Sequence, residues 1–429
     1  MTSNSYSQST PTLLEKRYEG KWIPLVLYVL YSVTHFYLHD FGKVLPHGLW
    51  FVWLFSVVVL DSKKLSKSLK SRKYSLFFIF LLFYFFTSAM GVGLSSGINR
   101  TIAFAEVCSP ILMFDLYRKT STKKMRFVVI FFVLILLFNA YFLYQTVNNN
   151  LWGLNGLRNI GDFFEENSAL ANVFHLLYAI SMTTMMLFYI VIHNQTYLSF
   201  KKRGIVVCCL LLIIIFFSYI IIRSLYMTTL LSLIMGLFLS LMYGRQNWIL
   251  KTLVILITFY VSFVVLYDVV VPPLLQLAGD NGVLQMRFEE IHSLISGELM
   301  QGTTMGARND LAGNSWKTFL ENPLLGINYK INDFEKFRYV IIGNHSQWID
   351  DLARYGVFSI VLFFFIYKSM KPIWKDYPLF PLFAIYVFIG IFNPVFYFIQ
   401  NSTIFFYLPM FFAYLTRKAV NGNHSPNIV

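Results

Sequence analysis

Three arginines occupy unusual positions among the apolar stretches of this 429-residue sequence. Arg100 ends a short loop, Arg158 lies in the loop NGLRNIGDFFEEN, and Arg223 interrupts a long apolar run. Two interpretations are open for Arg223. Its side chain extends from a tight helical hairpin to the lipid headgroups, or it converges with other arginines on a phosphate group, whose oxygens a planar guanidinium binds in pairs.

Two further arginines, Arg287 and Arg308, belong to a long hydrophilic segment at residues 272–351. Acidic residues outnumber basic ones in this segment, so its average charge is not positive. Any anion site in it must therefore consist of a few positioned arginines. A connecting segment of this length is uncommon and is usually functional.

His345 lies near the end of this segment. Apolar residues follow it at helical spacing and predict a helix that starts near Asn344 or Ser346 and continues into an apolar span. The imidazole titrates near neutrality and can take a proton from a hydroxyl. A histidine that only caps the helix or hydrogen-bonds the loop is the alternative, and Asp350 and Asp351 are rival bases.

A metal site formed by His345, Asp350 and Asp351 is a weaker interpretation, because no second histidine lies at ligand spacing and His292 is distant. The sequence also contains no phosphate-binding loop, dinucleotide fingerprint or nucleophile elbow. We therefore expect no metal ion and no cofactor.

Membrane helices must position these side chains. Hydrophobic residues make up 57% of the chain and charged residues only 13%, a balance that soluble domains do not have. Since about 20 apolar residues cross a bilayer, the composition predicts about 12 spans. We place them at about 22–38, 44–60, 75–92, 101–117, 127–146, 168–192, 204–222, 225–243, 251–271, 352–367, 378–393 and 402–416.

Positive charge predicts the orientation, because short cytoplasmic loops retain Lys and Arg. With the N-terminus inside, most of the 35 basic residues fall on the inner side. The net charge of +14 is then a topology signal, and we expect no nucleic-acid partner. The first 21 residues lack the apolar core of a cleavable signal, so the first apolar segment should remain as an anchor.

The predicted fold class is therefore all-α: a polytopic membrane protein with about 12 transmembrane helices and one large extracytoplasmic loop. Its parts are a cytoplasmic tail (1–21), a bundle of about nine helices (22–271), the large loop (272–351), the last three helices (352–416) and a second cytoplasmic tail (417–429).

Four segments within residues 150–370 share a pattern with one known superfamily. The first comprises Arg158, Gly161, Glu166, Asn167, Ala169 and Ala171, and the second is Arg223, preceded here by Ile222 where the family usually has Ser or Thr. The third comprises Arg308, Trp316, Phe319, Asn322, Pro323, Leu324 and Gly326. The fourth comprises Asn344, His345, Trp348, Leu352, Tyr355 and Gly356, with Ser346 where many relatives have Asn. Together they resemble the O-antigen ligase and O-antigen polymerase (Wzy-type) superfamily of membrane glycosyltransferases.

This resemblance implies transfer of a glycan from undecaprenyl diphosphate to a hydroxyl acceptor at the outer face of the bacterial cytoplasmic membrane, without metal or nucleotide. The expected enzyme polymerises repeat units of an O-antigen, capsule or exopolysaccharide. Its expected partners are the lipid-linked oligosaccharide, membrane lipid, a flippase and a chain-length regulator. In the implied site His345 is the catalytic base, Arg158, Arg223, Arg308 and, less strongly, Arg287 bind the diphosphate, and Asp350, Asp351 and Trp316 support them.

Three alternatives stay open. Within the superfamily, a ligase would pass the finished glycan to the lipid A core, and it shares the same motifs. A polysaccharide or lipid-carrier transporter should have charged or Gly/Pro-broken helices near mid-membrane in two related halves; the sequence contains no such repeat. A non-catalytic assembly scaffold would leave His345 dispensable.

Overall fold

The structure is a computed structural model of the chain. It describes residues 22–37, 44–118, 122–149, 173–193, 203–224, 226–242, 304–330, 341–375, 379–397 and 399–420. Arg158, Arg287, the predicted span at 251–271 and both predicted tails lie outside the described residues, apart from residues 417–420.

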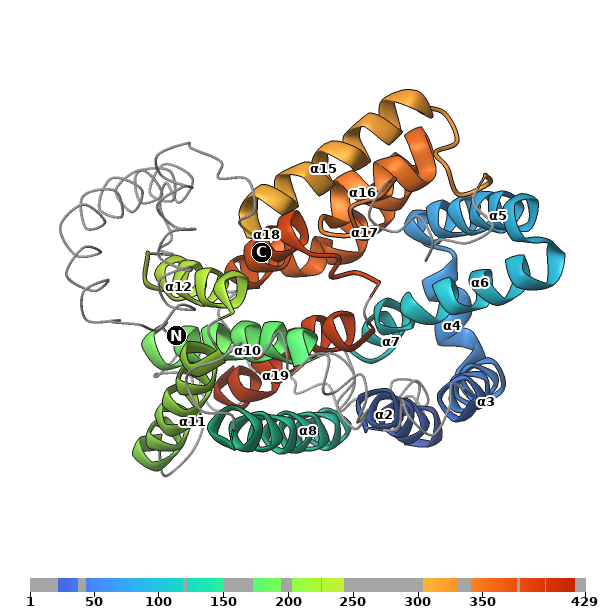
Figure 1. Cartoon of the computed structure of the whole chain (residues 1–429). Coiled ribbons are helices and arrows are strands. Elements are labelled where there is room, and N and C mark those ends of the chain that lie inside the picture. Colours follow the sequence, from blue (N-terminus) through green and yellow to red (C-terminus); the bar gives the residue numbers. More distant parts are fainter. Residues whose placement is uncertain are drawn as a thin grey trace, which may run out of the picture.

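The described part of the chain is almost entirely helical and contains no strand. Its helices are α2 (Trp22–Tyr37), α3 (Val44–Leu60), α4 (Ser62–Leu69), α5 (Arg72–Val92), α6 (Leu94–Val107), α7 (Ser109–Tyr117), α8 (Thr122–Asn149), α10 (Val173–His193), α11 (Arg203–Ser224), α12 (Met227–Met242), α15 (Thr304–Glu321), α16 (Gln347–Tyr355), the short 3₁₀ helix η3 (Gly356–Phe358), α17 (Ser359–Trp374), α18 (Phe380–Phe392) and α19 (Ile399–Val420). Figure 1 shows their arrangement.

Within the described residues, three helical stretches are long and apolar enough to cross a membrane: Arg72–Val92, Arg126–Gln145 and Gly204–Ser224. A fourth is added if α3 and α4, which are bent by 98° where they meet, count as one span. Helices α2, α10, α12 and α18 contain shorter apolar stretches. These apolar helices indicate that the protein associates with a membrane.

Two predicted continuous spans are broken. The stretch at 101–117 divides into α6 and α7 at Cys108, because Pro110 has no N–H to continue the helical hydrogen bonds. The helix expected to run from residue 344 or 346 into the span at 352–367 ends at Gly356, where φ is +57°. The prediction of one helix from residue 344 or 346 into the span at 352–367 is therefore wrong, and the apolar stretch at 101–117 consists of two helices.

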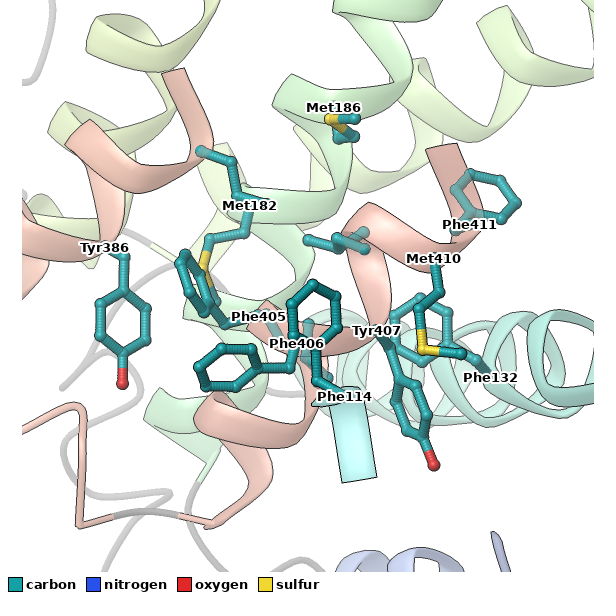
Figure 2. Packing of buried hydrophobic residues seen from close by; sticks show 14 of the residues in the cluster. Phe114, Phe132, Met182, Met186, Tyr386, Phe405, Phe406, Tyr407, Met410 and Phe411 are labelled. Carbon is teal, nitrogen blue, oxygen red and sulfur yellow. The ribbon is translucent and has the colours of Figure 1, made fainter. Parts of the chain in front are cut away.

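The core is an apolar and aromatic interior shared by helices from both halves of the chain. Helix α19 lies between α8 and α10 and also packs on α7 and α2 (Figure 1). Figure 2 shows Phe405 and Phe406 of α19 among Phe114 of α7 and Met182 of α10. The outward faces of α3 and α5 instead carry exposed aromatic and aliphatic side chains, as expected for helices in contact with lipid.

Candidate functional site

The site is built on a joint between α15 and α16, which lie side by side in Figure 1. The segment after α15 runs against the end of α16 and bonds to its backbone. The Asn328 N–H donates to the Arg354 carbonyl at 3.1 Å, and the Val357 N–H donates to the Pro323 carbonyl at 2.8 Å. The third and fourth segments of the family resemblance therefore meet in space.

Two glycines permit this close approach. Gly326 and Gly356 have φ of +67° and +57°, a backbone conformation that other residues rarely adopt. A Cβ at Gly326 would lie 2.2 Å from the Arg354 carbonyl carbon, and one at Gly356 would lie 2.5 Å from the Pro323 oxygen. Both positions thus require glycine for steric as well as conformational reasons.

Asp350 joins α15 to the start of α16. Its carboxylate accepts a 2.6 Å hydrogen bond from the Ser315 hydroxyl and a 3.0 Å bond from the Ser346 N–H. The same Ser315 oxygen accepts a bond from the Gly343 N–H at 2.9 Å. Burial raises the pKa of Asp350 above its ordinary value, although these hydrogen bonds and the Arg354 charge oppose the shift. Its contacts make Asp350 a cap and a tether for the residues just before α16.

Asp351 points into the helix bundle and is fully buried. The Tyr397 hydroxyl donates to its carboxylate at 2.5 Å, and the Gln347 amide donates at 2.7 Å. The Gln347 amide oxygen accepts from the Phe396 N–H at 2.9 Å, which fixes the segment between α18 and α19. Burial raises the pKa of Asp351 to about 7, against the opposing effects of the Arg354 charge and the two hydrogen bonds.

Arg354 connects the two carboxylates to the turn before α16. Its guanidinium donates to the Asn344 side-chain oxygen, lies 5.4 Å from the centre of the Tyr397 ring, and interacts electrostatically with Asp350 and Asp351. The positive charge of Arg354 therefore acts on both carboxylates. Asp350, Asp351 and Arg354 together form the acid–arginine cluster.

A polar hollow of about 690 Å³ opens at the turn between α5 and α6. Arg100 lines it, and the charges of Arg100 and Arg354 both act on the hydroxyl of Tyr84. The hollow adjoins the joint between α15 and α16, because Gly91, which lines the hollow, packs against the backbone of Asn328. Its lining residues are Gly91, Val92, Gly93, Ser96, Asn99 and Arg100.

His345 lies immediately before α16 and is partly exposed. The helix begins at Gln347 with Ser346 as its N-cap, which confirms the prediction that a helix starts just after His345. Both neighbours of the histidine are held: Asn344, with φ +54°, accepts from Arg354, and Ser346 donates to Asp350. The backbone at His345 is therefore fixed by the acid–arginine cluster.

Of the four arginines predicted to bind diphosphate, Arg223 has its side chain among the described residues. Arg223 is partly buried in the last turn of α11. Nearby, the Tyr226 hydroxyl lies 3.5 Å from the Asn393 side-chain oxygen, in the segment that also carries Tyr397. Arg308 belongs to α15, but its side chain lies outside the described part, as do Arg158 and Arg287. Their convergence stays a prediction.

Trp316 follows Ser315 on α15 but is 48% exposed, and its ring lies 5.4 Å from that of Phe319. It makes no described contact with the acid–arginine cluster. Trp316 therefore lies on the outer surface of α15, and its supporting role stays a prediction.

Sequence reasoning missed several residues of this site. Arg354 gave a local signal, because it follows Asp350 and Asp351 at helical spacings of four and three residues. Tyr397 and Tyr84 gave none, because they reach the cluster only through packing between distant segments. In the described residues, no group of three or more His, Cys, Asp or Glu side chains is placed to hold a metal ion.

No protein-family model matches the chain, and no curated protein sequence is significantly similar to it.

Proposed function

We propose that this protein is a membrane glycosyltransferase that polymerises lipid-linked repeat units of an O-antigen, capsule or exopolysaccharide. The observation that carries the proposal is the joint between α15 and α16, where residues of two motifs far apart in the chain make backbone contacts at the end of the helix that His345 precedes. The proposal includes twelve spans, an outward-facing large loop and a bacterial cytoplasmic membrane location.

In the proposed reaction, His345 takes the proton of the acceptor sugar hydroxyl while its oxygen attacks the anomeric carbon of the donor. A new C–O bond forms, and the bond from the anomeric carbon to the diphosphate oxygen breaks. Undecaprenyl diphosphate leaves with the bonding electron pair, and the anomeric configuration inverts. Arginine side chains neutralise the charge that develops on the leaving group.

The local geometry favours His345 over Asp351 as the base. Asp351 has a pKa near neutrality, but its carboxylate is fully buried and already accepts bonds from Tyr397 and Gln347. His345 is partly exposed in a turn whose two neighbours are held in place. Asp350 is then a positioning residue that holds this turn.

The polar hollow beside the joint supports a place for the substrate. Arg100, Asn99 and Ser96 offer hydrogen-bond donors to sugar hydroxyls and anionic groups, and none of the described residues that line the hollow is acidic. We assign it to the saccharide–diphosphate end of the donor, with the lipid tail along the apolar outer faces of the helices.

The decisive experiment reconstitutes the purified full-length chain in vesicles with a lipid-linked repeat unit as its only substrate. We expect a ladder of polymer and a matching release of undecaprenyl diphosphate, both absent from the His345→Ala variant. Addition of lipid A core as acceptor separates the ligase, which would transfer to the core without forming a ladder. Absence of any new glycosidic bond in either reaction would contradict the proposal.

A transporter is the second candidate, and specific features favour it. The apolar helices are interrupted at Cys108 and Gly356, and two pairs of ionisable side chains join different helices: Lys73 with Asp115, which are largely buried, and His47 with Glu106 at 2.5 Å. Broken helices and internal charges are typical of transporters. Movement of lipid-linked substrate across the vesicle bilayer without bond formation would identify this activity.

A further inference from the structure

Helix α4 lies almost at right angles to the apolar helix before it. The angle between Leu45–Leu60 and Ser62–Leu69 is 98° (Figure 1). The sequence changes sharply at the same point, from a run of aromatic and aliphatic residues to SKKLSKSL. A segment with so many lysines cannot continue through hydrocarbon, so the bend marks the membrane boundary.

The lysines of α4 form one stripe. Lys63, Lys67 and Lys70 follow one another at spacings of four and three residues, which places them on one side of the helix, and all three are exposed. On the opposite side Leu65 packs against the core. Helix α4 is thus held to the protein by its apolar side and presents its basic side outward.

The carboxylate that directly precedes α4 is buried on the side of α7. Asp61, at the bend, is buried and accepts a 3.2 Å hydrogen bond from the Tyr117 hydroxyl of α7. Lys64 lies 5.9 Å from the centre of the same tyrosine ring. Arg72, which begins α5, is exposed and extends the basic surface. Among the described residues, no acidic side chain therefore pairs with Lys63, Lys67 or Lys70 on the outward face of α4.

The depth of this surface follows from α3. The outward side of α3 exposes large apolar residues, including Phe51, Phe55 and Val59, as expected for a helix in contact with acyl chains. A helix that turns by about a right angle at the end of such a span lies along the membrane plane, at the level of the headgroups. There a row of lysines faces lipid phosphates.

We propose that α4 is a membrane-surface helix that binds anionic phospholipid headgroups through Lys63, Lys67 and Lys70. The inference is independent of the glycosyltransferase proposal, since it rests on the bend, the apolar side of α3 and the basic stripe. The bound class is a phosphodiester lipid with a net negative charge, such as phosphatidylglycerol.

The test uses the full-length chain in an uncharged detergent with a polarity-sensitive fluorophore at Ser66→Cys, within the basic stripe. The exposed Cys208 and Cys209 are first replaced by Ser, while Cys108 is buried and stays. Phosphatidylglycerol or phosphatidylcholine is then titrated into the micelles. We expect a saturable change with phosphatidylglycerol alone, and weaker binding at high salt.

Two charge-matched comparisons make the test specific. Lys63→Gln with Lys67→Gln should weaken phosphatidylglycerol binding by roughly fivefold per lysine, whereas Lys63→Arg with Lys67→Arg should retain it. Lys371→Gln with Lys375→Gln removes the same charge from exposed positions elsewhere and should have a smaller effect. An equal response to both lipids, insensitivity to salt, or equal losses from the two Gln pairs would overturn the proposal.

Discussion

The hydroxyl of Ser315 donates a 2.6 Å hydrogen bond to the carboxylate of Asp350, 35 residues further along the chain. The same carboxylate caps the residues before α16, where it accepts from the Ser346 N–H. One buried side chain therefore sets both the packing of α15 on α16 and the position of the turn that contains His345.

Asp350→Asn should lower both stability and activity. The amide NH₂ replaces one oxygen that now accepts a bond, so one of the two buried donors loses its partner at a cost of about 1–3 kcal/mol. Thermal unfolding and polymer yield at a temperature well below the transition measure the two effects. Ser315→Ala should give a change in the same direction. Wild-type stability in both variants would show that the tether is unimportant.

Gly326→Ala and Gly356→Ala should each destabilise the joint. Positive φ costs a non-glycine residue about 1–3 kcal/mol, and the new methyl would meet backbone atoms at 2.2 Å or 2.5 Å. Gly313→Ala on α15 is the matched control, because a Cβ there meets nothing within 4 Å. It should raise stability by about 0.5–1 kcal/mol through helix propensity. Melting curves that rank the three variants otherwise would contradict the described packing.

The stability of the protein should fall as pH rises from about 4 to about 7. Burial raises the pKa of Asp351 from 3.8 to about 7, so in this interval the folded chain keeps a proton that the unfolded chain has released. The raised pKa of Asp350 acts in the same direction. Unfolding midpoints at pH 5 and pH 8 measure the effect. Asp351→Asn should reduce the difference between them, and an undiminished difference would assign it to other groups.

The position of His345 just before a helix could be predicted from sequence, because the apolar residues that follow it have helical spacing. The break at Gly356 could not, since it arises where the Pro323–Leu324 backbone crosses the chain. Nor could the partner of Asp351, because Tyr397 is 46 residues away in a turn between two other helices. Apolar runs likewise identify helices, but the number of membrane spans that these helices form depends on bends such as the one between α3 and α4.

Arg223→Lys and Arg308→Lys should each reduce glycan transfer although charge is kept. A diphosphate needs paired donors in a plane, and an ammonium group cannot provide that geometry. Arg72→Lys is the control: Arg72 is the exposed first residue of α5, so this change should leave transfer unchanged. Polymer yield at matched protein levels measures all three. Wild-type activity in both test variants would remove these arginines from the proposed phosphate site.

The final prediction concerns the identity of the base. If His345 removes the acceptor proton, His345→Gln should abolish polymer formation, because an amide imitates the hydrogen bond but does not take up a proton. The protein should still fold, since the bonds that hold the turn come from Asn344 and Ser346. Lipid-linked single repeat units should then accumulate.

Asp351→Asn separates the two candidate bases when it is measured beside His345→Gln. In its described position Asp351 orders Tyr397 and Gln347, so its Asn variant should retain part of the activity and show a lower unfolding midpoint. A carboxylate base predicts the reverse pattern, with complete loss in Asp351→Asn and substantial polymer from His345→Gln. The ratio of polymer to accumulated repeat units in the two variants, at equal amounts of folded protein, therefore decides which side chain accepts the proton.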